Sequence, residues 1–181
     1  MGAGNYSPST QSRIADLILG LHVETTGGVL VAAHFTNAAQ TELFNIYGRI
    51  AVMQLFVELT AAADANLTQV QFNCRFTTPV IVVNALGAKC ASIAALGAYG
   101  RIIHVAGAVA AAAAITDSAG YSDVDTAGRK SILGGVSAAG VATIGVIGML
   151  VSDATQAATI AATGHLFYVP MSEGAYAEAA L

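Results

Sequence analysis

The side chains in this sequence that could bind a metal ion or act as a general base are four histidines, which stand far apart along the chain. They are His22, His34, His104 and His165. None stands with a cysteine, aspartate or glutamate in the spacing of a zinc-binding motif. An isolated histidine is usually a packed or interfacial residue, so we expect no bound metal and no cofactor.

Two short segments are similar to parts of ligand-binding loops. Residues 123–128 (Asp-Val-Asp-Thr-Ala-Gly) resemble the opening of a calcium loop, but Gly134 stands where such a loop needs a bidentate glutamate. Residues 128–131 (Gly-Arg-Lys-Ser) resemble the end of a phosphate-binding loop, but Arg129 replaces a required glycine and the upstream glycine is missing. We interpret both as parts of one solvated polar loop.

The remaining reactive side chains show no catalytic arrangement. The 11 aspartates and glutamates are spread along the chain, and the nucleophile-elbow, zinc-protease and dinucleotide-binding motifs are absent. Cys74 and Cys90 could form one disulfide bridge, but two small buried thiols is the interpretation we prefer. We therefore predict no catalytic residue and a protein that is not an enzyme.

The composition leaves little charge to cover a protein surface. Lysine and arginine number 7 and aspartate and glutamate 11, together 10 % of 181 residues, against about a quarter in ordinary soluble domains. The net charge is −4 and the basic residues are scattered, which argues against a nucleic-acid partner. Lipid or other protein subunits should therefore cover part of the surface.

Residues 132–151 are the best candidate for a membrane span, because they form a run of 20 residues without a charge. Against a span, the run holds five glycines and mostly β-branched apolar residues, and the chain has no tryptophan. Gly140 stands where a turn would divide the run into two strands. We prefer protein neighbours and expect no membrane, and a small membrane protein of phage lysis remains the alternative of another class.

Strand patterns dominate the rest of the sequence. Residues 67–76 alternate apolar and polar side chains, as a half-buried strand does. Residues 44–59 are apolar on both faces, which indicates a strand covered on both sides. Further strands are predicted at 28–35, 80–84, 100–106, 141–150 and 165–169. These patterns predict an all-β fold, an antiparallel, jelly-roll-like sandwich, with a core that includes Phe72, Cys74, Phe76, Ile50, Val52 and Phe56.

The first residues form a separate arm in this interpretation. Residues 1–24 are assigned to an N-terminal arm and residues 25–181 to the β-sandwich domain. Within the arm, residues 13–21 have apolar side chains at helical spacing, with Ser12 available as N-cap. We expect this short helix to dock on a neighbouring subunit through Ile14, Leu17, Ile18 and Leu21.

Three segments resemble the small virion structural proteins of tailed bacteriophages. Residues 39–50 (Ala-Gln-Thr-Glu-Leu-Phe-Asn-Ile-Tyr-Gly-Arg-Ile) are similar to their entry strand, and residues 162–175 (Ala-Thr-Gly-His-Leu-Phe-Tyr-Val-Pro-Met-Ser-Glu-Gly-Ala) to their closing strand. Residues 142–145 (Ala-Thr-Ile-Gly) fall where such chains often carry Gly-Thr-Ile. The chain departs from the pattern by 38 extra N-terminal residues and by Leu166-Phe167 in place of the usual tryptophan.

The resemblance implies a structural role in a virion that is assembled in the host cytoplasm. The first expectation is a capsid decoration or cement subunit, and the alternative is a head–tail connector or tail accessory protein. The partners so implied are copies of the chain itself, as a trimer by analogy with the local symmetry of capsid lattices, and the major capsid protein.

Overall fold

The computed structural model describes residues 20–25, 30–35, 40–63, 69–78, 82–87, 89–90, 93–94, 96–104, 114–116, 131–134, 144–152 and 160–181. Within them the chain forms β-strands and one 3-10 helix, η1 (Ala32–Phe35), without any α-helix. The strands are β1 (Leu21–Glu24), β2 (Leu30–Val31), β3 (Gln40–Tyr47), β4 (Ile50–Ala61), β5 (Gln69–Thr78), β6 (Val82–Ala85), β7 (Arg101–Ile103), β8 (Ala114–Thr116), β9 (Ser131–Leu133), β10 (Ile144–Ser152), β11 (Ala161–Pro170) and β12 (Tyr176–Ala179).

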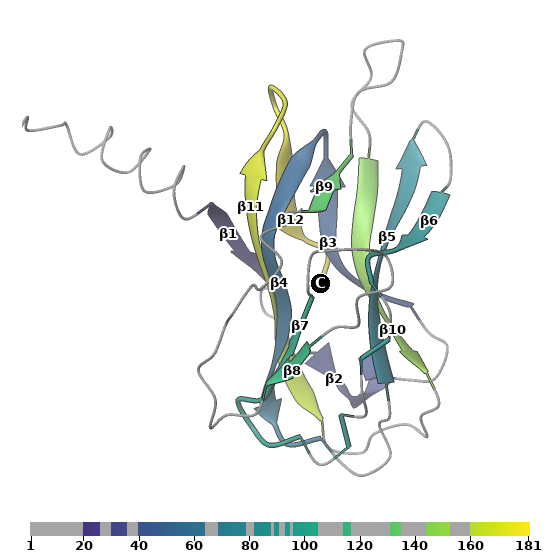
Figure 1. The fold of residues 1–181 in the computed structure, drawn as a ribbon, viewed down its shortest axis with the longest axis vertical. Coiled ribbons are helices and arrows are strands. Elements are labelled where there is room, and N and C mark those ends of the chain that lie inside the picture. Colours follow the sequence, from purple (N-terminus) through teal and green to yellow (C-terminus); the bar gives the residue numbers. More distant parts are fainter. Residues whose placement is uncertain are drawn as a thin grey trace, which may run out of the picture.

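The strands build two antiparallel sheets (Figure 1). The seven-stranded sheet has the order β1-β11-β4-β7-β8, with β2 also paired to β11 and β9 to β4, and the five-stranded sheet has the order β12-β3-β10-β5-β6. The eight strands that correspond to a jelly roll are β1, β3, β4, β5, β6, β7, β10 and β11. If these are renumbered 1 to 8 in chain order, the seven-stranded sheet contains them in the order 1-8-3-6 and the five-stranded sheet in the order 2-7-4-5. This is the strand order of a jelly roll, so the predicted fold is confirmed.

The hydrophobic core lies between the two sheets. Along β11, Leu166 and Tyr168 are buried while His165 and Phe167 are only partly buried, as expected for a strand with one inner and one outer face. In the five-stranded sheet Phe44, Ile147 and Cys74 are in register on three neighbouring strands, and each is fully buried. The Tyr168 hydroxyl donates to the carbonyl of Ala177, which links the two sheets.

Most of the predicted core residues lie in the core, but the predicted inner position of Phe56 is corrected by the structure. Ile50, Val52, Phe72 and Cys74 belong to the central cluster, and Phe76 packs against it half-buried. β4 contains a bulge at Met53, because Phe167 pairs with Gln54 and Tyr168 with Val52. The extra residue shifts the alternation, so Phe56 lies on the outer face of the sheet. There His165, Phe167 and Arg101 pack against its ring and leave it 7 % exposed.

Two predicted strands are interrupted in the structure. Residues 44–59 belong to β3 and β4, which are joined by a tight turn in which Gly48 has a φ of +75°, a conformation that favours glycine. Of residues 28–35 the structure describes 30–35, where the strand Leu30–Val31 is followed by η1. The ring of His34 accepts the Val31 N–H and the His34 carbonyl accepts the Thr41 hydroxyl, which stabilises a turn instead of an extended chain.

The run considered as a membrane span contains two strands that belong to different sheets. β9 pairs with β4 in one sheet, and β10 is the central strand of the other. Among the described residues, no helix is long and apolar enough to cross a membrane.

Part of the predicted N-terminal arm is described, and it joins a sheet. Residues 21–24 form β1, which pairs with β11. Leu21 is partly buried and packs against the hydrophobic core, whereas Ile14, Leu17 and Ile18 lie outside the described residues. The calcium-like segment 123–128 lies outside them too. The docking role of the four apolar residues stays a prediction.

Candidate functional site

His22, Glu24 and His165 come together on the outer face of the seven-stranded sheet. Because side chains alternate along a strand, His22 and Glu24 share one face of β1, while Leu21 and Val23 pack against the core on the other. β11 runs antiparallel to β1 with Glu24 opposite His165 and His22 opposite Phe167. This register places the His165 ring beside both polar residues of β1.

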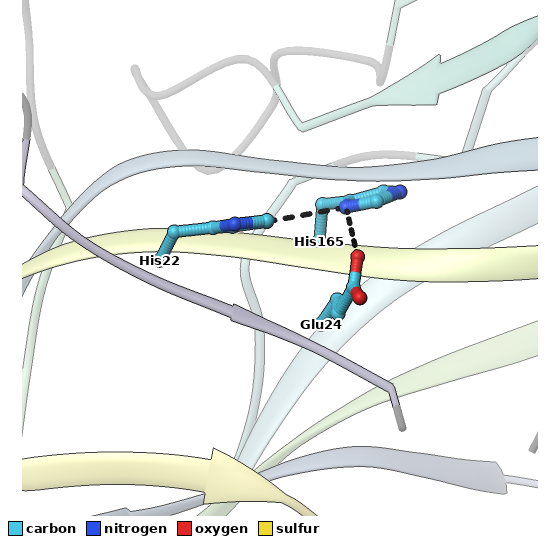
Figure 2. Close-up of side chains that lie close together, drawn as sticks. All are labelled: His22, Glu24 and His165. Carbon is cyan, nitrogen blue, oxygen red and sulfur yellow. Dashed lines mark hydrogen bonds and ion pairs between the residues drawn. The ribbon is translucent and has the colours of Figure 1, made fainter. Parts of the chain in front are cut away.

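The three side chains converge through single ligand-type atoms (Figure 2). Nε2 of His22 lies 3.2 Å from Nδ1 of His165, and Nδ1 of His165 lies 3.7 Å from Oε2 of Glu24. One ligand atom from each residue fits within 4.8 Å of the other two. His22 and Glu24 are exposed and His165 is half-buried, so the cluster opens to solvent on one side.

The surroundings of His165 favour its neutral form. Burial lowers the pKa of His165 from its ordinary value, and the neighbouring His22 lowers it further, while the carboxylates of Glu58 and Glu24 act in the opposite direction. A neutral imidazole keeps one nitrogen with a free lone pair. The cluster can therefore hold a proton between two rings, or present two nitrogens and a carboxylate to a cation.

Aromatic packing restricts the orientation of both histidine rings. His22 stacks on Phe167 with ring centres 4.3 Å apart, and His165 stacks on Phe56 at 4.7 Å. Arg101 lies over the Phe56 ring, 5.2 Å from its centre, and is held by an ion pair with Glu58 at 2.6 Å. The ring faces contact one another, so this row is not a flat aromatic platform of the kind that stacks on a sugar or base.

The cluster differs from what the sequence analysis expected of the histidines. His22 and His165 are 143 positions apart, and only the pairing of β1 with β11 brings them together. One local signal was available, because His22 and Glu24 are two positions apart and thus share a face of any strand. Residues 1–24 were assigned to an arm with a helix at 13–21, so no strand was predicted at His22 and Glu24.

A second feature lies at the end of the sandwich where β3 joins β4 and β11 joins β12, the upper end in Figure 1. Ile144 pairs with Tyr47, and Tyr47 pairs with Tyr176, so the three form a row across β10, β3 and β12. Met171 donates its N–H to the Arg49 carbonyl, which joins the two turns. We call these five residues the end patch: Tyr47, Arg49, Ile144, Met171 and Tyr176.

Most of the end patch is exposed to solvent. Tyr176 is 45 %, Met171 51 % and Ile144 41 % accessible to solvent. The rings of Tyr47 and Tyr176 stack with centres 4.4 Å apart, and the Tyr47 hydroxyl donates to Glu178 at 3.1 Å. That hydrogen bond is the main reason why the pKa of Tyr47 is raised, so the hydroxyl keeps its proton at neutral pH.

Both cysteines are free and buried, as the sequence analysis preferred. Burial raises the pKa of Cys74 to about 12. The Cys90 sulfur accepts the Val70 N–H, and burial raises the pKa of this thiol as well. Neither thiol is therefore a ready nucleophile or metal ligand at neutral pH.

No protein-family model matches this chain, and comparison with curated proteins and with solved structures likewise finds no match.

Proposed function

We propose that this protein is a structural subunit of a tailed-phage particle, a capsid decoration or cement protein without enzymatic activity. In this proposal the end patch contacts a neighbouring subunit. The resemblance of residues 39–50 and 162–175 to small virion proteins supports the proposal, and those two segments include three of the five patch residues, Tyr47, Arg49 and Met171. The phage head is proposed first, with the head–tail connector or the tail as alternatives.

The observation that carries the proposal is the composition and exposure of the end patch. Tyrosine, methionine and arginine are enriched in protein interfaces, where the buried centre is depleted of charge. Two stacked tyrosines also lose little conformational entropy when they are covered. An isolated protein gains nothing from three large apolar side chains exposed at one end of the sandwich, so a partner surface accounts best for them.

The low charge of the chain points the same way. With 10 % charged residues, the surface offers few of the repulsive and hydrated groups that keep proteins apart at high local concentration. A subunit that stays packed between other subunits does not need these charged groups. The jelly roll is compatible with this role because viral capsid proteins use it, but lectins and cupins use it as well, so the fold alone selects none of these functions.

We propose two partners for the assembled state, further copies of this chain and the major capsid protein. Self-association is expected to be visible in isolation. Sedimentation at micromolar concentration should give a species heavier than the 18.2 kDa monomer, and a trimer is the state that the local symmetry of a capsid lattice favours. A stable monomer would argue against the self-association.

The end patch itself is tested by occupancy on particles. Particles are grown with Tyr176→Ser or Met171→Ser, and with Val31→Ser as the matched control. Val31 is 46 % exposed and lies on β2, which pairs with the start of β11, far from the patch. The patch variants should keep the melting temperature of the wild type but lose occupancy several-fold, and the control should lose none. Full occupancy of both patch variants would refute the docking role.

A further inference from the structure

The geometry of His22, Glu24 and His165 points to a metal site, and we propose that these residues bind a divalent transition ion such as Zn²⁺ at the edge of the seven-stranded sheet. The proposal is independent of a role in a virion, because it concerns the isolated chain. It assigns a function to the only group of three metal-ligating side chains found among the described residues.

The donor set suits zinc and its neighbours in the first transition row. Imidazole nitrogen is a preferred ligand of these ions, and carboxylate oxygen commonly completes the set. Two histidines and one carboxylate also form the protein part of many sites that leave a position open for water. Mg²⁺ and Ca²⁺ prefer sets made of oxygen alone, so the two nitrogens give selectivity against them.

The distances fit a shared ion. Two atoms bonded to one zinc at about 2.0–2.1 Å with a tetrahedral angle are about 3.3–3.4 Å apart. Nε2 of His22 and Nδ1 of His165 are 3.2 Å apart, and Nδ1 of His165 is 3.7 Å from Oε2 of Glu24. Only small side-chain rotations of the exposed His22 and Glu24 are needed, and Figure 2 shows both turned toward His165.

Packing restricts the freedom of both rings before an ion arrives. Phe167 packs on His22 and Phe56 on His165, so few ring orientations are lost on binding. Such preorganisation lowers the entropy lost on binding.

Binding would fasten an otherwise weakly held strand. β1 has four residues, lies at the edge of its sheet and has β11 as its only paired neighbour among the described strands. An ion held by two residues of β1 and one of β11 would cross-link the two strands. The site would thus stabilise the place where the N-terminal residues enter the domain.

The experiment is a calorimetric titration of the full chain, free of affinity tag and stripped with a chelator, with ZnCl₂. The expected result is one ion per chain. His22→Gln and Glu24→Gln should each weaken binding by at least about tenfold, because even partners outside the coordination shell contribute about 10–100-fold. Both residues are exposed, so the variants should fold. His34→Gln is the matched control, since His34 lies in η1 outside the cluster.

A second measurement reports on the strand. Hydrogen exchange at the amides of residues 21–24 should slow on addition of ZnCl₂ in the wild type and in His34→Gln, and should not respond in His22→Gln. The proposal is overturned if no heat and no slowing of exchange occur at millimolar ZnCl₂. It is equally overturned if His22→Gln and Glu24→Gln bind zinc as the control does, or if MgCl₂ binds as tightly.

Discussion

The ring of Phe76 covers Gly145 so closely that a methyl group on Gly145 would lie 2.6 Å from Cδ1 of the ring. The two residues are register partners on β5 and β10, and the absent side chain gives the ring its place beside the core. Gly145→Ala should therefore reduce the free energy of unfolding by about 1–3 kcal/mol, as overpacking does. Urea denaturation measures the change.

A double-variant cycle isolates this contact. In a Phe76→Ala background the ring no longer meets the added methyl group and only the Arg75 carbonyl oxygen, at 3.2 Å, stays close to it. Gly145→Ala should therefore cost much less there than in the wild type. Equal costs in the two backgrounds would show that Gly145 is required for its backbone conformation and not for the ring.

Phe72 is the large side chain whose removal should cost most in β5. It is 2 % exposed and packs in a T-shaped arrangement with the ring of His104, which follows β7 in the opposite sheet. Phe72→Ala should lower the free energy of unfolding by about 3–5 kcal/mol. Phe76→Ala is the comparison, and it should cost less because Phe76 is only partly buried. A loss below about 1 kcal/mol at Phe72 would mean that the strand faces outward.

Stability should fall with acidification because of His104. Burial lowers the pKa of His104 from its ordinary 6.5, so the unfolded chain takes up a proton near pH 6.5 while the folded protein stays neutral. The unfolded state then binds more protons, and the free energy of unfolding decreases as the pH falls below about 6.5 until the folded pKa is reached.

The measurement compares urea denaturation at pH 7.5 and 5.5 in the wild type and in His104→Gln. The variant cannot take up this proton, so its loss of stability across the interval should be smaller. Identical losses in both proteins would rule out His104 as a source of the pH dependence.

Neither thiol should react in the folded protein. Burial raises the pKa of Cys74 to about 12 and raises that of Cys90, so at pH 8 both remain protonated and out of reach. A disulfide reagent that releases a coloured thiol should report no reactive cysteine under native conditions and two in denaturant. Rapid reaction of one thiol in the native protein would contradict this burial.

The sequence predicted the parts of the fold that depend on local alternation. The pattern of residues 67–76 marked β5, and the apolar β-branched residues after Gly140 marked β10. The inner position of Phe56 was predicted wrongly because the pattern assumes unbroken alternation, and a one-residue bulge at Met53 shifts it. Bulges depend on the pairing strand, which the pattern of a single strand does not contain.

The candidate metal site was beyond local patterns for a similar reason. His22 and Glu24 could be placed on one face of a strand, but the third member is His165, 143 positions away from His22. The pairing of β1 with β11 is a contact between the two ends of the described domain. The end patch depends likewise on the pairing of β12 and β10 with β3, which brings Tyr176 and Ile144 to Tyr47.

The most direct test of the proposed function is quantitative mass spectrometry of purified phage particles that were assembled with this chain present. A decoration or cement subunit should be found at hundreds of copies per particle, in a fixed ratio to the major capsid protein. About a dozen copies or fewer would move the protein to the neck or tail. Absence of the chain from washed particles would contradict a role as a structural component of the virion.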